Sequence, residues 1–332
     1  MIDTDCDTVE FERHRRRLLG IAYRMLGEMS AAEDVMQDAW LRWQRADRSE
    51  IRDTGAWLAA ATVRLSLDAL RKVRARREVY VGPWLPEPIL PDDVRALTVD
   101  GLATRAELAS DLSLALLHVL ERLSPDERAA FVMHEAFGCE YAEIAATLNK
   151  SEPACRKLVS RAKERVKMDR PRYTVSADQH HKLVQEFLSA VAAQDPKRLA
   201  EIFAPDVAFY SDGGGRVSAA LRPILGMEKV SRLFLGLVRK LATQHSPQVE
   251  TTDINGRPGM LAMMDGEIYG AFAFEAEDQR ITAIYSIRNP DKLARVSRVL
   301  SASQVFEVPN EHRNVPALGS RNTITVIPAK PR

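Results

Sequence analysis

Residues 141–163 carry two short helical patterns joined by a polar turn, and the second pattern is rich in Arg and Lys. Ile144 and Leu148 mark the apolar face of the first pattern, and Ser151 is placed to cap the free N–H groups that open the second. Such a helix can neutralise DNA phosphates and hydrogen-bond to base edges in the major groove. Its polar face carries Arg156, Lys157, Ser160, Arg161 and Lys163. A surface hairpin with a solvated charged face has the same local pattern, so this motif alone leaves both interpretations open.

A second basic cluster ends an upstream helical pattern over about residues 54–76. It contains Arg64, Arg71, Lys72, Arg74, Arg76 and Arg77. The chain has 47 Lys and Arg against 46 Asp and Glu, so affinity for nucleic acid has to come from local clusters and not from net charge. Two separated clusters predict contacts with two stretches of one DNA, and each phosphate contact makes binding more sensitive to salt.

The helical pattern over about residues 30–45 has a polar face that its own fold does not explain. Ser30 and Glu33 predict a capping box at its start. The side chains that share the polar face, at i, i+3, i+4 and i+7, are Asp34, Gln37, Asp38 and Leu41. Taken alone, the acids are ordinary solvated helix charges, whereas a docking surface for a partner is the other interpretation.

The 332 residues are enough for two or three domains. Helical periodicity predicts small all-α modules over residues 8–77 and 107–168. Between them, residues 78–106 include VGPWLPEPILPDD, whose four prolines predict a stiff linker. Trp84 and Leu85 are too apolar for a plain spacer, so we expect part of the linker to pack against another surface.

Residues 178–296 predict an α+β domain in which helices lead into an antiparallel sheet. The predicted strands cover about residues 247–254, 258–264, 267–275 and 280–288. Residues 297–332 have little periodicity, and we expect a loose tail with one short strand at about residues 323–327.

The remaining composition excludes several functional classes. Cys6, Cys139 and Cys155 lack the spacing of a zinc site or a disulfide framework, so no metal or other cofactor is expected. No apolar stretch reaches the roughly 20 residues that span a bilayer. We therefore expect a cytoplasmic protein that does not act at a membrane.

Three segments resemble regions 2 and 4 of bacterial extracytoplasmic-function (ECF) sigma factors: EDVMQDAWLRW, GAWLAAATVRLSLDALRKVRARRE and LSPDERAAFVMHEAFGCEYAEIAATLNKSEPACRKLVSRAKERV. The resemblance covers about residues 8–168 and implies binding to core RNA polymerase and to two promoter elements. It assigns polymerase binding to Asp34, Gln37, Asp38 and Leu41. It assigns the minus 10 element to Arg64, Asp68, Arg71, Lys72, Arg74, Arg76 and Arg77. It assigns the minus 35 element to Ser151, Glu152, Arg156, Lys157, Ser160, Arg161 and Lys163.

Three further motifs, WLPEP, DGGGR and NPDKL, resemble the SigJ-like subgroup, in which a SnoaL-like domain of the nuclear-transport-factor-two type follows the sigma regions. Members commonly have Lys after the three glycines, where this chain has Arg216. The resemblance implies that the fused domain regulates the sigma regions. We predict that the linker and the DGGGR loop contact one another and keep regions 2 and 4 in a compact arrangement unsuited to promoter spacing. The residues it singles out are Trp84, Leu85, Pro86, Asp212, Gly213, Gly214, Gly215, Arg216, Asn289, Pro290, Asp291 and Lys292.

We therefore predict a non-enzymatic, promoter-specific sigma factor that is modulated by its own C-terminal domain. The alternative hypothesis is a ligand-sensing DNA-binding regulator, or an enzyme, that uses a pocket in residues 178–296. For the enzyme, His245, Asp212 and Asp253 are the candidate acid–base residues. A ligand in the C-terminal domain is compatible with either hypothesis.

Overall fold

The structure, a computed structural model, describes residues 4–77, 80–97, 112–169, 176–243, 247–305 and 322–325. The chain divides into two compact units. The first consists of Met1–Val79 and Asp92–Arg170, and the second of Tyr80–Pro91 and Pro171–Arg332. Part of the predicted linker thus belongs to the C-terminal unit. Among the described residues, no helix is long and apolar enough to cross a membrane.

The first unit begins with three helices, α1 (Thr4–Leu26), α2 (Met29–Arg45) and α3 (Thr54–Arg77), with a 3₁₀ turn at Arg48–Glu50. Their apolar stripes meet in a core that includes Leu18, Met25, Val35, Trp43 and Leu58. The left-handed Gly27 ends α1, with its N–H donating to the Tyr23 carbonyl at 2.7 Å. Trp40 and Trp57 are only half-buried, and each packs its ring edgewise or tilted against another aromatic side chain.

The predicted capping box at the start of α2 is wrong. The helix begins at Met29, so Ser30 already lies inside its first turn, and the cap position belongs to Glu28, whose side chain makes no capping hydrogen bond. The Ala32 N–H donates to the Glu28 carbonyl at 3.1 Å, which starts the helical ladder before Ser30. The local sequence signal was misread by two residues, a common error at helix ends.

The rest of the first unit is also helical. Its elements are α4 (Pro91–Ala96), α6 (Leu114–Leu120), α7 (Pro125–Phe131), a π-helical turn (Val132–Ala136), α8 (Tyr141–Leu148) and α9 (Glu152–Asp169). Ser124 caps α7 in a capping box with Glu127. The predicted linker range contains the helix α4, because Pro91 is acceptable in a first turn. The start of the helix predicted from residue 107 lies outside the described residues.

The helix-turn-helix is confirmed as a local structure. Asn149 ends α8 in the left-handed conformation, with φ 53°. The Ser151 hydroxyl then accepts a hydrogen bond from the Ala154 N–H at 3.4 Å, and Pro153 occupies the first turn of α9. Ile144, Val159 and Ala162 are buried, so the apolar faces of both helices point inward.

The second unit is an α+β fold built on a seven-stranded sheet. Its helices are α10 (Ala177–Ala192), α11 (Pro196–Ile202), α12 (Met227–Ala242) and α13 (Pro290–Val305). Its strands are β1 (Phe203–Asp212), β2 (Ile224–Leu225), β3 (Pro247–Ile254), β4 (Arg257–Met264), β5 (Glu267–Glu277), β6 (Arg280–Ile287) and β7 (Asn322–Thr325). The strand order is β2-β1-β6-β5-β4-β3-β7, with β1 and β6 parallel and every other neighbouring pair antiparallel.

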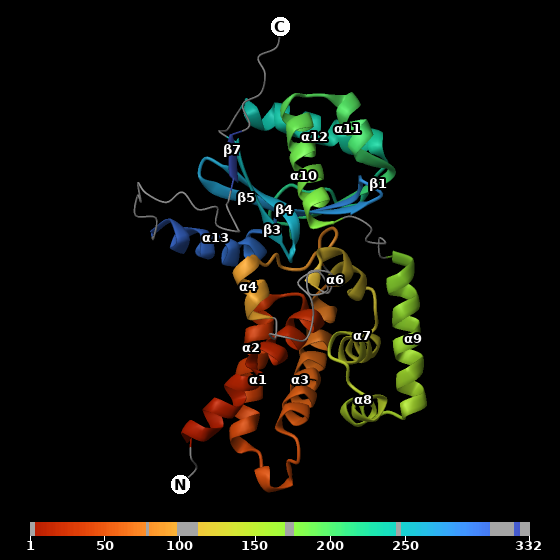
Figure 1. The fold of residues 1–332 in the computed structure, drawn as a ribbon, viewed down its shortest axis with the longest axis vertical. Helices are drawn as coiled ribbons and strands as arrows, with labels where there is room; N and C mark the ends of the chain where they lie inside the picture. Colours follow the sequence, from red (N-terminus) through yellow and green to blue (C-terminus); the bar gives the residue numbers. More distant parts are fainter. Residues whose placement is uncertain are drawn as a thin grey trace. The chain divides into compact units, whose positions relative to one another are not determined.

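Helices α10, α11 and α12 lie together over one face of the sheet (Figure 1). The core between them and the strands is rich in aromatic side chains, with Phe187 within 6 Å of the rings of Phe203, Phe234 and Phe274. Helix α13 packs beside β5, and it continues to Val305, well into the predicted tail. The pattern of Leu293, Val296 and Leu300, all buried, explains the helix that the sequence reading missed. The predicted short terminal strand is confirmed as β7.

Candidate functional sites

Helix α2 presents one polar face outward. Asp34, Gln37 and Asp38 are exposed, and Leu41 is 39% exposed. The opposite face, which includes Val35 and Ala39, is buried against the other helices of the bundle. All four predicted polymerase-binding side chains are therefore available on one helical surface, and a charge change there leaves the core untouched.

The residues predicted to read the minus 10 element lie on α3, and two of them contact the helix-turn-helix region. The Arg64 guanidinium donates to the carbonyls of Thr147 (3.1 Å) and Ala146 (3.0 Å). These carbonyls end α8, where partial negative charge favours a cation. Arg71 lies 3.3 Å from the Asp126 carboxylate of α7 and 3.6 Å from Asp68. In this conformation two nitrogens of the exposed Arg64 side chain are therefore engaged by the end of α8.

Lys72 is exposed on α3. The side chains of Arg74, Arg76 and Arg77 lie outside the described residues, although the helix itself continues to Arg77.

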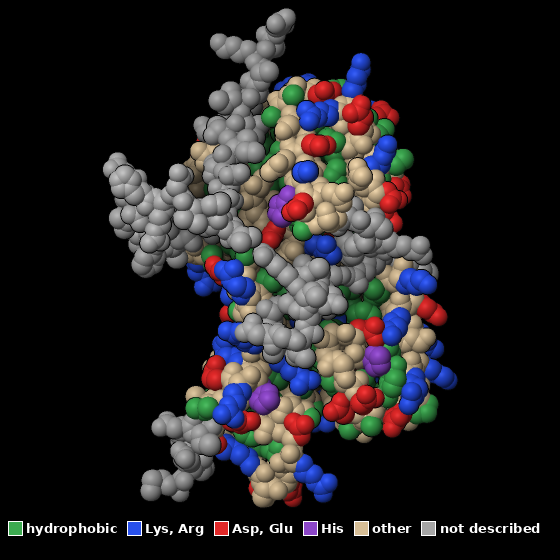
Figure 2. Space-filling model, viewed as in Figure 1, with side chains coloured by type: hydrophobic (Ala, Val, Ile, Leu, Met, Phe, Trp, Pro, Cys, Tyr) green, Lys and Arg blue, Asp and Glu red, His purple; other side chains and the backbone are tan. Residues whose placement is uncertain are grey.

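Helix α9 exposes the predicted minus 35 residues. Ser151, Glu152, Arg156, Lys157, Ser160, Arg161 and Lys163 are all exposed. In the space-filling view, Lys and Arg side chains follow the length of this helix, with few acidic ones among them (Figure 2). The acids partly neutralise the face, since Glu152 lies 3.2 Å from Arg156 and Glu135 lies 2.8 Å from Lys163. The Arg156 guanidinium also stacks over Tyr141, 4.4 Å from the ring centroid.

The described cysteines have structural roles. Cys139 and Cys155 are buried, and burial raises the pKa of both thiols. Among the residues whose side chains are described, no group of three or more His, Cys, Asp or Glu could hold a metal ion.

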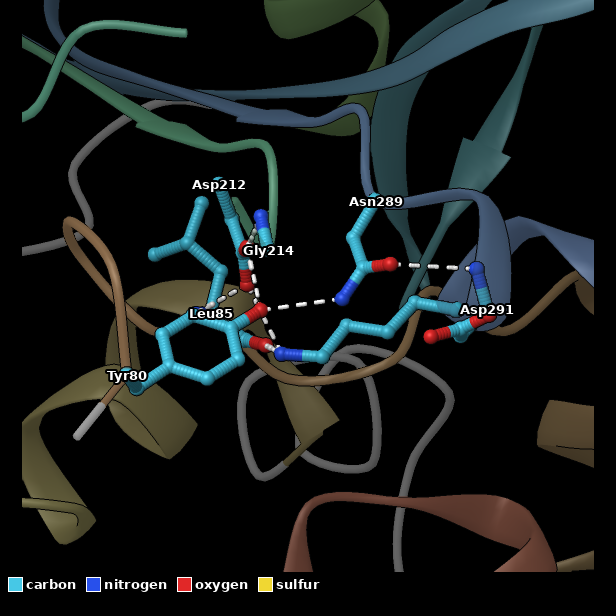
Figure 3. Close-up of polar contacts among 7 residues, drawn as sticks. Tyr80, Leu85, Asp212, Gly214, Asn289 and Asp291 are labelled. Atoms are coloured by element: carbon cyan, nitrogen blue, oxygen red, sulfur yellow. Dashed lines mark hydrogen bonds and ion pairs between the residues drawn. The ribbon is translucent and has the colours of Figure 1, made fainter. Parts of the chain in front are cut away.

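The C-terminal unit contains a buried polar network centred on Asp212, at the end of β1. Its carboxylate is fully buried and accepts hydrogen bonds from the Tyr80 hydroxyl (2.6 Å) and the Leu85 N–H (2.9 Å). It also accepts from the Gly214 N–H (3.0 Å) and pairs with the Lys292 ammonium (2.7 Å). Four donors thus satisfy one buried carboxylate, which is the condition under which a buried charge is tolerated. Figure 3 shows these groups converging from the linker, the β1 end and the segment that opens α13.

Lys292 and Asn289 complete the network. Lys292 is 6% exposed, donates to the Leu85 carbonyl, and lies 3.9 Å from the Trp84 ring centroid. Asn289 donates to the Tyr80 hydroxyl at 2.9 Å and accepts from the Asp291 N–H at 3.0 Å (Figure 3). The same segment is tied to β1 by its backbone, because the Asn289 N–H donates to the Asp212 carbonyl at 2.9 Å. We call this set, Asp212, Tyr80, Leu85, Gly214, Asn289 and Lys292, the Asp212 network.

Residues 80–90, here called the strap, are also held at their far end. The Ile89 N–H donates to the Asn255 side chain at 3.1 Å, and the Asn255 N–H donates to the Ile89 carbonyl at 2.9 Å. Leu85, Ile89 and Leu90 are buried, with no more than 3% exposure. The strap is therefore an integral part of the C-terminal unit, which explains why this linker is so apolar.

Gly214 has a specific steric reason to be glycine. Its φ is +60°, and a Cβ there would lie 2.4 Å from the Asn289 side-chain nitrogen. Arg216, by contrast, is exposed, and its ion pair with Asp291 at 3.1 Å joins two exposed side chains. The replacement of the family's usual Lys by Arg at this position therefore leaves the buried network unaffected.

The sequence motifs include most members of the Asp212 network, but they do not include Tyr80, nor Asn255, which holds the far end of the strap. Tyr80 lies just outside the WLPEP motif, and nothing local distinguishes it from any other linker tyrosine. Asn255 precedes Gly256 in a β-turn, a sequence signal that could have been found, but its buried side chain and its contact with the strap could not. Of the candidate acid–base residues, His245 lies outside the described residues and Asp253 pairs with His181 at 3.3 Å.

Comparison with known proteins decides the family. The chain matches Sigma-70 region 2 over residues 11–77 and Sigma-70 region 4 over residues 113–166. It is 38% identical to the ECF RNA polymerase sigma factor SigJ of Mycobacterium tuberculosis strain H37Rv, over 92% of this chain and 99% of that protein. The chain belongs to the ECF sigma factors. It is therefore a non-enzymatic, SigJ-like sigma factor that binds core RNA polymerase and promoter DNA and directs transcription initiation.

Two further similarities extend over most of the chain. The probable ECF sigma factor SigI of the same organism is 32% identical over 88% of this sigma factor and 97% of its own length. The crystal structure of M. tuberculosis SigJ superposes with a TM-score of 0.67 and 34% identity, covering 86% of this chain and 98% of that one. The α+β unit is thus shared with SigJ and is not an addition peculiar to this sigma factor.

Proposed function

We propose that the C-terminal unit modulates this sigma factor by clamping the linker between regions 2 and 4. The observation that supports this proposal is the Asp212 network, which holds the strap through a fully buried carboxylate. In the same proposal, the exposed face of α2 docks on polymerase, α3 contacts the minus 10 element, and α9 contacts the minus 35 element.

The clamp restricts how far regions 2 and 4 can separate. The strap and its neighbouring residues form the covalent connection between regions 2 and 4. While the strap is docked, its residues cannot extend, so the connection is effectively shorter. A released strap can extend to about 3.3–3.6 Å per residue, roughly 35 Å end to end, so its release lengthens the connection by the difference between this span and the docked one. Two DNA-binding helices that must contact separated promoter elements need that reach.

The contacts of Arg64 support a closed form of the sigma regions as well. Arg64 gives its Nε and one terminal nitrogen to the end of α8, so turning these donors toward promoter DNA requires that α3 and α8 separate. Closed and open forms differing by a few kcal/mol would let polymerase select the open form through its greater affinity for it. Opening of the sigma regions is then coupled to polymerase binding, and the docked strap determines the free energy that opening requires.

Transcription by purified core polymerase with full-length Gly214→Ala tests the clamp. The added Cβ displaces Asn289, whose amide then no longer supports Tyr80, and the loss of about 1 kcal/mol of strap binding raises transcription roughly five-fold. Gly266→Ala is the matched control: Gly266 also has positive φ (+86°), yet no atom of the described residues lies within 4 Å of its added Cβ. Equal output from both variants and the parent chain would overturn the regulatory proposal.

A gel-shift assay tests the DNA-binding assignment. A sigma factor whose Arg64 is engaged by α8 is expected to bind its promoter specifically only when core polymerase is present. Specific, high-affinity binding by the full-length chain alone would contradict the closed form proposed here.

A further inference from the structure

A cavity in the C-terminal unit is lined in part by residues that adjoin the segments that hold the strap, namely Val217, Arg288 and Pro290. It has a volume of about 470 Å³, within the usual range for small-molecule sites. Its walls come from the loop after β1 (Val217), the adjoining ends of β4 and β5 (Met263 and Ile268) and the helix α13 (Leu293 and Leu300). The cavity is thus bounded by the chain segments that carry DGGGR and NPDKL.

Arg288 supplies a cation to this cavity. Its guanidinium stacks on Tyr269, 3.9 Å from the ring centroid, and donates to the Ser218 carbonyl. Its buried Nε has no hydrogen-bond partner, and no carboxylate of the described residues pairs with it. Burial lowers the pKa of this arginine, as expected for a cation that lacks a compensating anion.

The apolar interior of the C-terminal unit does not offer such a site. The region enclosed by α10, α12 and the sheet has a cavity of only about 60 Å³, lined by apolar side chains such as Phe187 and Phe234. A ligand there would have no polar group to orient it. The Arg288 cavity combines a cation with largely apolar walls, and its one carboxylate, Glu267, is exposed to solvent. The half-buried guanidinium with its unpaired Nε favours an anionic head, and the walls favour an apolar tail.

We propose that the Arg288 cavity binds a carboxylate with an unbranched apolar tail, such as a medium-chain fatty acid, and that this ligand stabilises the docked strap. The coupling has a direct structural path, because the Arg288 backbone N–H donates to the Asp212 carbonyl at 2.7 Å. An occupant also contacts Val217 and Pro290, which adjoin the loop and the helix start that hold Tyr80 and Leu85. A ligand that binds the strap-docked conformation shifts the equilibrium toward it. This second half of the inference rests on the proposed regulatory function.

Thermal unfolding of the full-length chain tests binding without polymerase or DNA. Decanoate is the probe, and decanol and decyltrimethylammonium are its neutral and cationic counterparts. Decanoate is expected to raise Tm by about 3 °C, and the other two compounds are expected to have little effect. Equal shifts from all three, or none from decanoate, would overturn the site.

Two variants locate the bound probe. Arg288→Met removes the cation, whereas Ser297→Trp keeps it and fills the cavity from α13. Both are expected to lose the decanoate shift. Arg298→Met changes an exposed residue of the same helix and should keep it. A shift retained in both Arg288→Met and Ser297→Trp would place the probe elsewhere and reject the proposal.

Hydrogen exchange tests the coupling separately. With decanoate bound, the Leu85 and Ile89 amides of the strap should exchange several-fold more slowly. If decanoate binds but the Leu85 and Ile89 amides do not exchange more slowly, the coupling to the strap is rejected, while the Arg288 cavity remains supported as a binding site. Failure of the Gly214→Ala transcription experiment would leave the binding result intact, so the two proposals fail independently.

Discussion

The hydroxyl of Tyr80 provides the most direct perturbation of the strap. It donates to Asp212 and accepts from Asn289, and it belongs to the strap itself. In Tyr80→Phe both partners lose a hydrogen bond while the strap is docked, but both are hydrated when the strap is released. The variant therefore weakens docking and leaves the released state unchanged.

The magnitude follows from the burial of these partners. Asp212 is fully buried and Asn289 is 5% exposed, so each unmade hydrogen bond costs on the order of 1 kcal/mol or more. Asp212 keeps its three other donors, which limits the loss. We expect a total of about 1–2 kcal/mol, and therefore roughly a 5- to 30-fold larger population of the released strap.

Native-state hydrogen exchange measures this population at the Leu85 and Ile89 amides. In Tyr80→Phe we expect both to exchange 5- to 30-fold faster, while amides in the sheet keep their rates. Tyr269→Phe is the control, because it removes a hydroxyl from the same unit that makes no hydrogen bond among the described residues. Unchanged Leu85 exchange in Tyr80→Phe would refute the reasoning, and so would equal acceleration across the sheet, which reports global destabilisation instead of strap release.

Three further outcomes are expected. Asp38→Lys reverses a charge on the exposed face of α2 and should weaken binding to core polymerase about ten-fold in a titration, with Tm unchanged. Lys157→Ala removes one exposed cation of α9 and should lower the slope of log affinity against log salt by about 0.9 in filter binding of the holoenzyme to promoter DNA. Burial, with positive charge on Arg257 and His181, lowers the pKa of His180 to about 4, so the unfolded chain takes up this proton first as pH falls from 6.5. Stability should therefore drop by roughly 3 kcal/mol by pH 4, and His180→Phe should flatten this loss in thermal unfolding, which a pH profile unchanged from the parent would contradict.

His181 has the opposite linkage. The hydrogen bond to Asp253 raises the pKa of His181, so its stabilising contribution is complete at low pH and is lost as pH rises through the folded-state pKa. Substitution of His181 therefore does not mimic His180→Phe, which makes it a useful comparison in the same experiment.

Much of this sigma factor follows from short-range sequence patterns. Helical spacing places Asp34 and Asp38 on one exposed face and Ile144 and Val159 in the interior, because side-chain direction repeats every 3.6 residues whatever the rest of the chain does. The turn chemistry of Asn149 and Ser151 is equally local. At the start of α2, the same kind of local reasoning failed, since several nearby residues can begin a helix and packing chose among them.

The hydrogen bonds between residues far apart in the sequence are decided by tertiary structure. Tyr80 and Asp212 are 132 positions apart, and Arg64 reaches a carbonyl 83 positions away. No local periodicity links such residues. Asp212 needs four donors only because the fold removes it from water, and Arg64 finds a partner only where α8 happens to end against α3. The sequence alone thus determined most of the helices, their faces and the family. Burial and long-range packing determined which of the polar side chains are engaged with one another.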